Sequence, residues 1–298
     1  MRCGFVALIG RPNVGKSTLL NRLVGTKLAI VSDKPQTTRN RIVGVRNYGE
    51  GQAIFLDTPG IHRPTHRMNV RMVDAAVEGI RQADLLALVT DATDARAGRG
   101  ERFILEQVKA ATSPVALVIN KVDLVDRAAL LPFIANWSGR HEFAEIVPVS
   151  ALTGENVDRL EQVIVKHLPE GEPIYPGDYL TDQPERFFVA ETVREKVLAL
   201  THAEIPFSSA VVVDRFEDAD DRGIMRFYCS ILVERESQKP ILIGRGGEMI
   251  KRIGMAARRD LEAFFDAHVH LDLRVKVESA WRENERLLDE MGLPRRSR

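Results

Sequence analysis

Residues 10–17 read GRPNVGKS, which matches the phosphate-binding pattern GxxxxGK[ST]. The stretch follows an apolar run at residues 5–9 and opens a helical pattern at residues 17–24. In that context the glycines let the backbone curl, so that successive amides at a helix start point at phosphate oxygens. Lys16 would reach the β- and γ-phosphates, and the Ser17 hydroxyl would ligate Mg²⁺. The stretch predicts a nucleoside triphosphate site, but it does not separate ATP from GTP.

The first part of the chain alternates short apolar runs with amphipathic stretches of helical length. This alternation is typical of βαβ units, in which helices cover both faces of a mainly parallel sheet. Residues 41–46 and 52–56 flank a polar turn, which predicts a hairpin and one antiparallel edge strand. We therefore expect an α/β P-loop NTPase domain with a mainly parallel six-stranded sheet. The apolar runs lie at residues 5–9, 53–56, 85–89, 115–119 and 146–149.

Residues 120–123, NKVD, follow a predicted strand and indicate which base is bound. The Asp123 carboxylate can accept hydrogen bonds from the ring N–H and the exocyclic amine of guanine together. Adenine lacks that pair of donors and would leave the charge unpaired. The side-chain amide of Asn120 can hydrogen-bond to the O6/N7 edge of guanine, and the aliphatic stem of Lys121 can cover the face of the base. A backbone N–H at residues 150–151 can donate to O6. The motif predicts GTP, although outside this context the same tetrapeptide would often be a plain turn.

Two further segments complete a predicted magnesium site. Residues 57–60, DTPG, end a strand, so that Asp57 is placed to hold Mg²⁺ through water and the Gly60 amide to sense the γ-phosphate. Residues 32–41, SDKPQTTRNR, form a polar loop with two adjacent threonines, one of which should complete the Mg²⁺ shell. We favour Thr38 over Thr37. A surface turn capped by hydroxyl groups is the alternative interpretation of this loop.

A change of rhythm divides the chain. Residues 168–184 hold four prolines and two glycines without an apolar period, which predicts a linker. A helix, two β-rich runs, a glycine loop with a second helix, and an alternating strand follow, and this order predicts a separate α+β module. A charged helix at 281–291 is expected to pack Trp281, Leu287 and Leu288 against the sheet of this module. The predicted limits are 1–169 for the first domain, 170–184 for the linker and 185–298 for the second domain.

Residues 243–251, IGRGGEMIK, hold a GxxG loop between apolar flanks and an emerging helix. Such a loop lets a nucleic-acid backbone pass close to main-chain amides, beside a cleft for about four nucleotides. Between residues 239 and 259 six basic residues face Glu248 alone, which makes a local basic patch. The element order is similar to that of type II KH domains and predicts RNA binding. A tight connection between two helices is the alternative.

The composition argues against several other classes of protein, among them disulfide-rich, secreted and membrane-spanning proteins. The 298 residues suffice for two domains, and the formal net charge of zero leaves attraction to nucleic acid to a local patch. The two cysteines, Cys3 and Cys229, are far apart, which argues against a disulfide framework and a cysteine zinc site. The N-terminus lacks a signal-peptide pattern, and no apolar run approaches the ~20 residues of a membrane span. We expect a cytoplasmic monomer, while membrane association cannot be read from the sequence.

The order and context of these motifs resemble those of translation-factor-related GTPases. The segments PQTTRNR and DTPGIH, with the KH-like module, resemble the Era-like subfamily over essentially the whole chain. The resemblance implies GTP hydrolysis with Mg²⁺, binding near the 3′ end of 16S ribosomal RNA, a role in 30S subunit assembly, and control of RNA access by GTP or GDP. Asn13 matches a P-loop asparagine that related enzymes use to help bind K⁺. A loop-shaping hydrogen bond is the alternative for Asn13.

The catalytic mechanism expected from this resemblance is simple. Ile61 stands after the DTPG glycine, where Ras-like enzymes carry the side chain that orients water. No intrinsic general base is evident, so we expect slow turnover through positioning and charge neutralisation. Lys16 and Thr38 would stabilise phosphate and metal, and Ser17, Thr38 and Asp57 (through water) would hold Mg²⁺.

The predicted binding residues form two sets. Those for RNA are Ile243, Gly244, Arg245, Gly246, Gly247, Lys251 and Arg252. Those for GTP are Gly10, Arg11, Pro12, Asn13, Val14, Gly15, Lys16, Ser17, Thr18, Asp57, Gly60, Asn120, Lys121, Asp123, Ser150 and Ala151.

Two other functions stay open at this point. A metabolic ATPase or kinase would use the same phosphate-binding loop, but it has no need of a guanine-selective carboxylate at Asp123. A nucleotide-gated RNA-binding scaffold or chaperone, in which hydrolysis is incidental, would carry all of these motifs.

Overall fold

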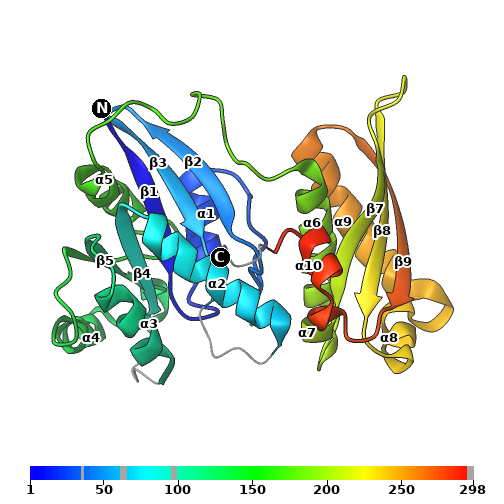
Figure 1. Ribbon diagram of the computed structural model, residues 1–298, viewed down its shortest axis with the longest axis horizontal. Coiled ribbons are helices and arrows are strands. Elements are labelled where there is room, and N and C mark those ends of the chain that lie inside the picture. Colours follow the sequence, from blue (N-terminus) through cyan, green and yellow to red (C-terminus); the bar gives the residue numbers. More distant parts are fainter. Residues whose placement is uncertain (35–36, 61–65, 95–98, 294–298) are drawn as a thin grey trace.

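The computed structural model describes residues 1–34, 37–60, 66–94 and 99–293. It consists of two lobes joined by an extended segment, each built on a sheet of its own (Figure 1). The N-terminal lobe holds a six-stranded sheet and the C-terminal lobe a three-stranded sheet. The predicted α/β domain followed by an α+β domain is confirmed. The domain limits, 1–169 and 185–298, stay a prediction.

The six strands lie in the order β2-β3-β1-β4-β5-β6. Neighbouring pairs are parallel except β2 and β3, which form an antiparallel hairpin that pairs Tyr48 with Gly51. The predicted antiparallel edge strand is therefore present. The strands are β1 (Arg2–Ile9), β2 (Ile42–Tyr48), β3 (Gly51–Asp57), β4 (Leu85–Asp91), β5 (Val115–Asn120) and β6 (Glu145–Pro148).

Helices cover both faces of this sheet, which is why its strands are apolar on both sides. Along β1, Val6 and Leu8 belong to one hydrophobic core, and Ala7 and Ile9 belong to the other. Helices α1 (Lys16–Val24) and α5 (Val157–His167) pack in the first core. Helices α2 (Arg67–Gln82), α3 (Arg99–Lys109) and α4 (Arg127–Ser138) pack in the second.

The segment between the lobes lies along the exposed edge of β2. The Leu180 carbonyl accepts a hydrogen bond from the Val45 amide at 2.8 Å, and the Thr181 hydroxyl donates to the Val43 carbonyl at 2.6 Å. The buried side chain of Gln52 accepts hydrogen bonds from two further amides of this segment. The predicted linker is therefore a strap that covers a sheet edge, and edges of this kind otherwise invite pairing with other chains.

The C-terminal lobe follows the predicted element order. Its sheet has the order β7-β8-β9, with β7 and β8 antiparallel and β8 and β9 parallel. Helices α6 and α9 pack on one face through apolar residues such as Val193 and Ala257. The elements are α6 (Glu185–Leu200), α7 (Ile205–Ser208), β7 (Ala210–Glu217), β8 (Ile224–Val233), η2 (Glu236–Gln238), α8 (Lys239–Ile243), η3 (Arg245–Gly247), α9 (Glu248–Phe265) and β9 (His268–Val277).

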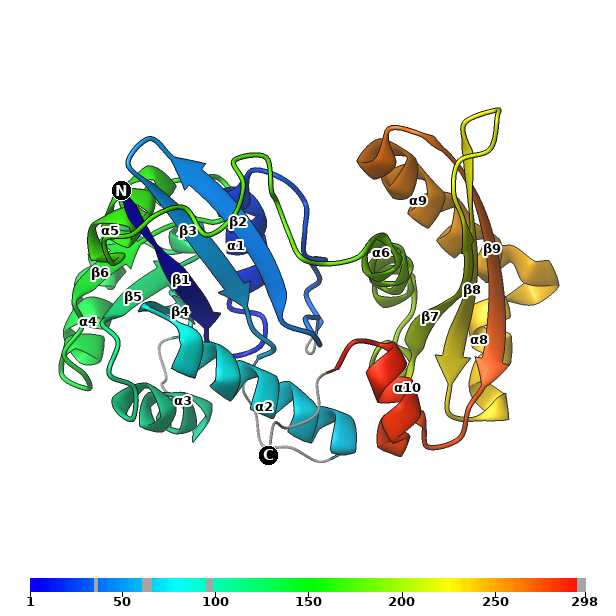
Figure 2. The same cartoon turned by 45° about the horizontal axis from the view of Figure 1, so that its top comes forward.

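The chain after β9 joins the two lobes. A 3₁₀ turn, η4 (Trp281–Glu283), and a short helix, α10 (Glu285–Glu290), replace the single predicted helix. As predicted, Trp281 packs on the sheet of the C-terminal lobe, beside Ala210 of β7. The same cluster also contains Met68 and Met72 of α2 and Leu288 of α10. Helix α10 therefore lies between the two lobes (Figure 2).

Of the helices in the described part of the chain, none is both long enough and apolar enough to cross a membrane.

Candidate nucleotide and RNA sites

The phosphate-binding loop connects the end of β1 to the start of α1. Gly15 caps α1 with φ 94°, and Asn13 has φ 65°, both in the left-handed region. A Cβ on Gly15 would lie 2.2 Å from Asn120 Nδ2, so that both the backbone angle and the space require glycine. The loop thus turns directly into the start of α1, where the free amides of a helix can bind an anion.

Lys16 is held inside this loop. Its Nζ donates to the Gly10 carbonyl at 3.2 Å and to the Arg11 carbonyl at 2.9 Å. Burial lowers the pKa of Lys16 to about 8, although the nearby Asp57 carboxylate acts in the opposite direction. An ammonium has three donors, so Lys16 has a further N–H for a phosphate oxygen.

Three oxygen-bearing side chains meet beside Lys16. The Ser17 and Thr38 hydroxyl oxygens are 2.7 Å apart, and Asp57 Oδ2 accepts from Ser17 at 2.8 Å and from Thr38 at 3.2 Å. Burial raises the pKa of Asp57, while Lys16 and the two hydroxyls oppose that shift. The buried Asp57 Oδ1 has no hydrogen-bond partner among the described residues. Hard oxygen donors of this kind fit Mg²⁺.

The two threonines point in different directions. The Thr37 hydroxyl donates to the Lys34 carbonyl at 2.7 Å, within its own loop. The Thr38 hydroxyl is buried and faces Ser17 and Asp57. Of the two, Thr38 has the geometry of a metal ligand.

A pocket of about 460 Å³ opens next to these groups, a volume within the range of small-molecule sites. Gly60 lies against the phosphate-binding loop, since a Cβ there would come within 2.8 Å of Pro12. Ile61, which is predicted to leave the site without a water-orienting side chain, lies outside the described residues. The pocket is lined by Pro12, Asn13, Gly15, Lys16, Ser17, Thr18, Ile30, Val31, Ser32, Asp33, Thr37, Thr38, Gly60 and Lys121.

Asn120 braces two loops of the site. Its Nδ2 donates to the Val14 carbonyl at 2.8 Å, and its Oδ1 accepts from the Ala151 amide at 2.9 Å. Ser150, next in this loop, is buried, and its hydroxyl accepts from the Thr153 amide at 3.1 Å. The side-chain amide of Asn120 is predicted to contact guanine. In the structure the same amide is hydrogen-bonded to the backbone of Val14 and Ala151.

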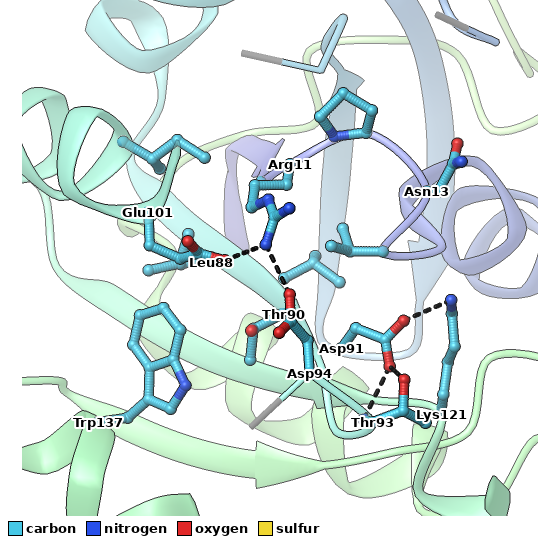
Figure 3. Close-up of a pocket in the computed structure, with 15 residues that line it drawn as sticks. Arg11, Asn13, Leu88, Thr90, Asp91, Thr93, Asp94, Glu101, Lys121 and Trp137 are labelled. Atoms are coloured by element: carbon cyan, nitrogen blue, oxygen red, sulfur yellow. Dashed lines mark hydrogen bonds and ion pairs between the residues drawn. The ribbon is translucent and has the colours of Figure 1, made fainter. Parts of the chain in front are cut away.

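Of the two charged residues that follow β5, Lys121 forms an ion pair and Asp123 is exposed. Lys121 has φ 64° and pairs with Asp91 Oδ2 at 2.5 Å (Figure 3). Burial tends to raise the pKa of Asp91, but the hydrogen bonds from Lys121 and Thr93 outweigh it and hold that pKa below its ordinary value. Asp123 lies in the 3₁₀ turn η1 (Val122–Leu124) with its side chain exposed, where a base can reach it.

The side chain of Arg11, which is predicted to bind GTP as part of the loop, is paired with two carboxylates. Its Nη1 lies 2.6 Å from both Asp94 and Glu101, in a second pocket of about 640 Å³ beside the phosphate-binding loop (Figure 3). The hydrogen bond with Glu101 is the main cause that raises the pKa of Arg11. Arg11 thus contributes its backbone carbonyl to Lys16, while its side chain is paired with carboxylates. No motif in the sequence pointed to Asp94 or Glu101.

The GxxG loop separates α8 from α9. Gly244, Gly246 and Gly247 have φ of 75°, 60° and 83°. A Cβ on Gly244 would lie 2.7 Å from the Met249 amide, whereas Gly246 and Gly247 face open space. Another backbone can therefore approach these two glycines closely.

Basic side chains surround this loop. Arg245, Lys251 and Arg252 are exposed, and Ile243 is partly buried beside them. None of these three cations forms an ion pair with any described residue. The loop and its neighbours together offer free positive charge and an accessible backbone, which is the combination that nucleic-acid binding needs.

Comparison with known proteins covers both lobes. A model of the 50S ribosome-binding GTPase family matches residues 5–121, and a KH domain model matches residues 204–282. GTPase Era from Geotalea daltonii is 53% identical over 289 residues, which is 97% of each chain. GTPase Era from Syntrophus aciditrophicus is 48% identical over 291 residues, covering 98% of this chain and 95% of that protein.

Two solved structures superpose on the whole molecule. A variant of Aquifex aeolicus Era bound to GDP·AlF4⁻ is 43% identical, with a TM-score of 0.95 over 98% of this chain and 99% of that chain. A structure of Era with MgGDPNP and nucleotides 1506–1542 of 16S ribosomal RNA is 42% identical, with the same TM-score and coverage. A score this high over both lobes means that the lobes are also arranged in the same way.

Proposed function

Because this chain belongs to the Era family of GTPases, we propose that it is a GTP-hydrolysing switch that binds the 3′ end region of 16S ribosomal RNA and acts in 30S ribosomal subunit assembly. The observation that supports this most is the pairing of two sites in one chain. The Ser17, Thr38 and Asp57 oxygens meet in one lobe, and an open glycine loop lies in the other. The relative solved with MgGDPNP and 16S RNA shares the arrangement of both lobes.

The magnesium ion would be held by Ser17 and Thr38 directly and by Asp57 through water. The donor set of two hydroxyls and a carboxylate supports this assignment, as does the buried Asp57 Oδ1 that has no partner among the described residues. When bound, Mg²⁺ withdraws negative charge from the β- and γ-phosphate oxygens.

Hydrolysis of GTP to GDP and phosphate then depends on positioning. Lys16 would direct an N–H toward the β- and γ-phosphates, and the first amides of α1 would add partial positive charge. Gly60 lies against the phosphate-binding loop, where its amide could meet the γ-phosphate. Because Ile61 offers no proton acceptor at the position that orients water in Ras-like enzymes, we propose slow intrinsic turnover.

Guanine would be selected by Asp123, which is exposed at the end of β5. Lys121 and the Ser150–Ala151 backbone border the same place, and Asn120 ties them to the phosphate-binding loop. A carboxylate that accepts two guanine donors rejects adenine, which lacks them.

A potassium ion at Asn13 is part of this proposal. Asn13 Nδ2 donates to the Asp33 carbonyl at 2.6 Å, which holds the asparagine at the mouth of the phosphate pocket and leaves its amide oxygen for a cation. GTPase rates in matched sodium and potassium buffers test this. Equal rates would leave Asn13 with a purely structural role.

RNA would lie across Gly246 and Gly247, with Arg245, Lys251 and Arg252 against its phosphates and Ile243 at the side of the cleft. The partners that follow are 16S ribosomal RNA and the 30S subunit, and binding to them implies a cytoplasmic location. We propose a monomer, with a GTPase domain at 1–169 and an RNA-binding domain at 185–298.

Two binding measurements and a GTP turnover assay on the full-length chain test this function. Labelled GTP should bind in preference to ATP, and an RNA with the sequence of the 16S 3′ end should bind in preference to unrelated RNA of equal length. Preference for ATP would favour a metabolic P-loop enzyme. Tight RNA binding with no GTP turnover would favour a scaffold in which hydrolysis is incidental.

A further inference from the structure

The loop at 32–41, which carries Thr38, is bound to the C-terminal lobe along much of its described length. Just before it, the Val31 amide donates to Glu195 Oε1 at 3.0 Å. The Lys34 ammonium donates to the Leu198 and Thr201 carbonyls at the end of α6. The Arg194 guanidinium donates to the Thr37 carbonyl. Helix α6 of the RNA-binding lobe thus contacts the loop that would close over Mg²⁺ and the γ-phosphate.

Among the residues that make these contacts, Arg194 is buried and held by a second residue of α6. Its side chain is 2% exposed, and its Nε and Nη2 lie 2.7 Å and 2.6 Å from the two carboxylate oxygens of Glu191. A paired guanidinium of this kind is rigid and directional. The Thr37 carbonyl that it binds belongs to the peptide that continues into Thr38, whose hydroxyl lies 2.7 Å from Ser17 Oγ.

Arg39 holds the other side of Thr38. Its Nη1 donates to the Ser209 carbonyl at 2.9 Å, and its guanidinium lies 5.4 Å from the centre of the Trp281 ring. The side chain is buried, and its Nε and Nη2 lack hydrogen-bond partners among the described residues. Burying a charged group whose hydrogen bonds are only partly made costs free energy, so the Arg39 contact stabilises the position of Thr38 less. The hydrogen bond from Arg194 to the Thr37 carbonyl is therefore the stronger of the two contacts that hold Thr38 in place.

We propose that Arg194 is a positioning residue for the nucleotide site: the RNA-binding lobe orients Thr38 toward Mg²⁺ through α6. This inference rests on the proposed function and extends it to a named contact. Since GDP lacks the γ-phosphate that recruits the loop at 32–41, the contact stabilises the GTP-bound state selectively. By linkage, the same contact transmits the nucleotide state to α6 and its lobe.

The test compares Arg194→Ala with the native full-length chain. We expect affinity for a non-hydrolysable GTP analogue with Mg²⁺ to fall about tenfold, as for loss of one hydrogen bond from a charged group. Affinity for GDP should change less than about twofold, because GDP offers no γ-phosphate to the loop that carries Thr38. Arg194→Lys, which can still donate to the Thr37 carbonyl, should recover part of the loss.

Two further variants keep the test decisive. Arg186→Ala removes an exposed cation from the same helix and should leave both affinities unchanged. Lys34→Met keeps the aliphatic stem but removes the bonds to α6, so it should reproduce the selective loss even if Arg194→Ala fails to fold. Equal losses for GDP and the analogue, or no loss in either variant, would overturn the inference. A native chain that binds no GTP would instead overturn the proposed function.

Discussion

At the scale of single residues, glycine geometry shapes the phosphate-binding loop, and ion pairs hold the side chain of Arg11 beside it. The pattern GxxxxGK[ST] marks the loop because its glycines leave the space that the backbone needs to turn around a phosphate. At Gly15, for example, an added Cβ would lie only 2.2 Å from Asn120 Nδ2. Arg11 lies within the motif, yet its side chain pairs with Asp94 and Glu101, which are far away in the sequence. Local spacing cannot reveal a partner brought close by a different strand and helix.

Asp123 gives the first prediction. Replacing Asp123→Asn removes the charged acceptor for guanine's two donors, so GTP affinity should fall by on the order of 10- to 100-fold while ATP binding stays weak. Equilibrium binding with labelled nucleotides measures this. Asp126→Asn, a neighbouring exposed carboxylate, is the matched control and should behave like the native chain. Undiminished GTP affinity in the Asp123 variant would remove this residue from base recognition.

Lys16 gives GTP affinity a pH dependence. Burial lowers its pKa to about 8 in the free chain, and the phosphates of a bound nucleotide would raise it. Below about pH 8 the group is charged in both states and contributes no slope. Above that pH the free chain loses a proton that the complex keeps, so affinity should fall by up to about tenfold per pH unit. Binding titrations between about pH 7 and 10 test this, and Lys16→Met should abolish the slope.

At the scale of elements, the strands were predicted well because apolar runs bounded by turns mark buried parallel strands. Helices α2 and α4 were not singled out from the sequence. Helix α4 includes Pro132, a residue that usually argues against a helix interior. The C-terminal helix was predicted as one unit, but Asn284 caps a new start after the 3₁₀ turn by accepting from the Arg286 and Leu287 amides.

The glycine loop before α9 gives a prediction at this scale. Replacing Gly246 and Gly247 with Asp puts two carboxylates where RNA phosphates would pass, so RNA affinity should fall at least about tenfold while GTP affinity is retained. Gly223→Asp is a matched control, because Gly223 also has positive φ (71°) and open space around it. Equal RNA binding by the loop variant and this control would direct attention to another basic surface.

At the scale of the whole molecule, the contacts between the lobes were the least predictable part. The sequence indicated a linker at 168–184, but not that it straps the edge of β2. Nor did it indicate that Arg71 of α2 donates to Asp289 at 2.8 Å and to the Leu293 carbonyl at 2.7 Å. These bonds depend on how two complete domains meet, and that arrangement is not encoded in any short pattern.

These contacts place two parts of the GTPase lobe, both expected to respond to the nucleotide, against the RNA-binding lobe. The loop at 32–41 meets α6, and α2, which follows the DTPG segment, meets α10. We therefore expect a change at the γ-phosphate to reach the RNA-binding lobe through both contacts. Because coupling between two binding sites is reciprocal, RNA should also favour the GTP-bound arrangement.

The central claim is that the nucleotide bound at residues 10–17 governs how tightly the glycine loop of the other lobe binds RNA. The most direct test measures the affinity of the full-length chain for an RNA of the 16S 3′ end with GDP and with a GTP analogue, each with Mg²⁺. We predict binding about tenfold or more tighter with the analogue, a coupling of typical size, and loss of this difference in Thr38→Ala. Equal RNA affinities with the two nucleotides would contradict the claim.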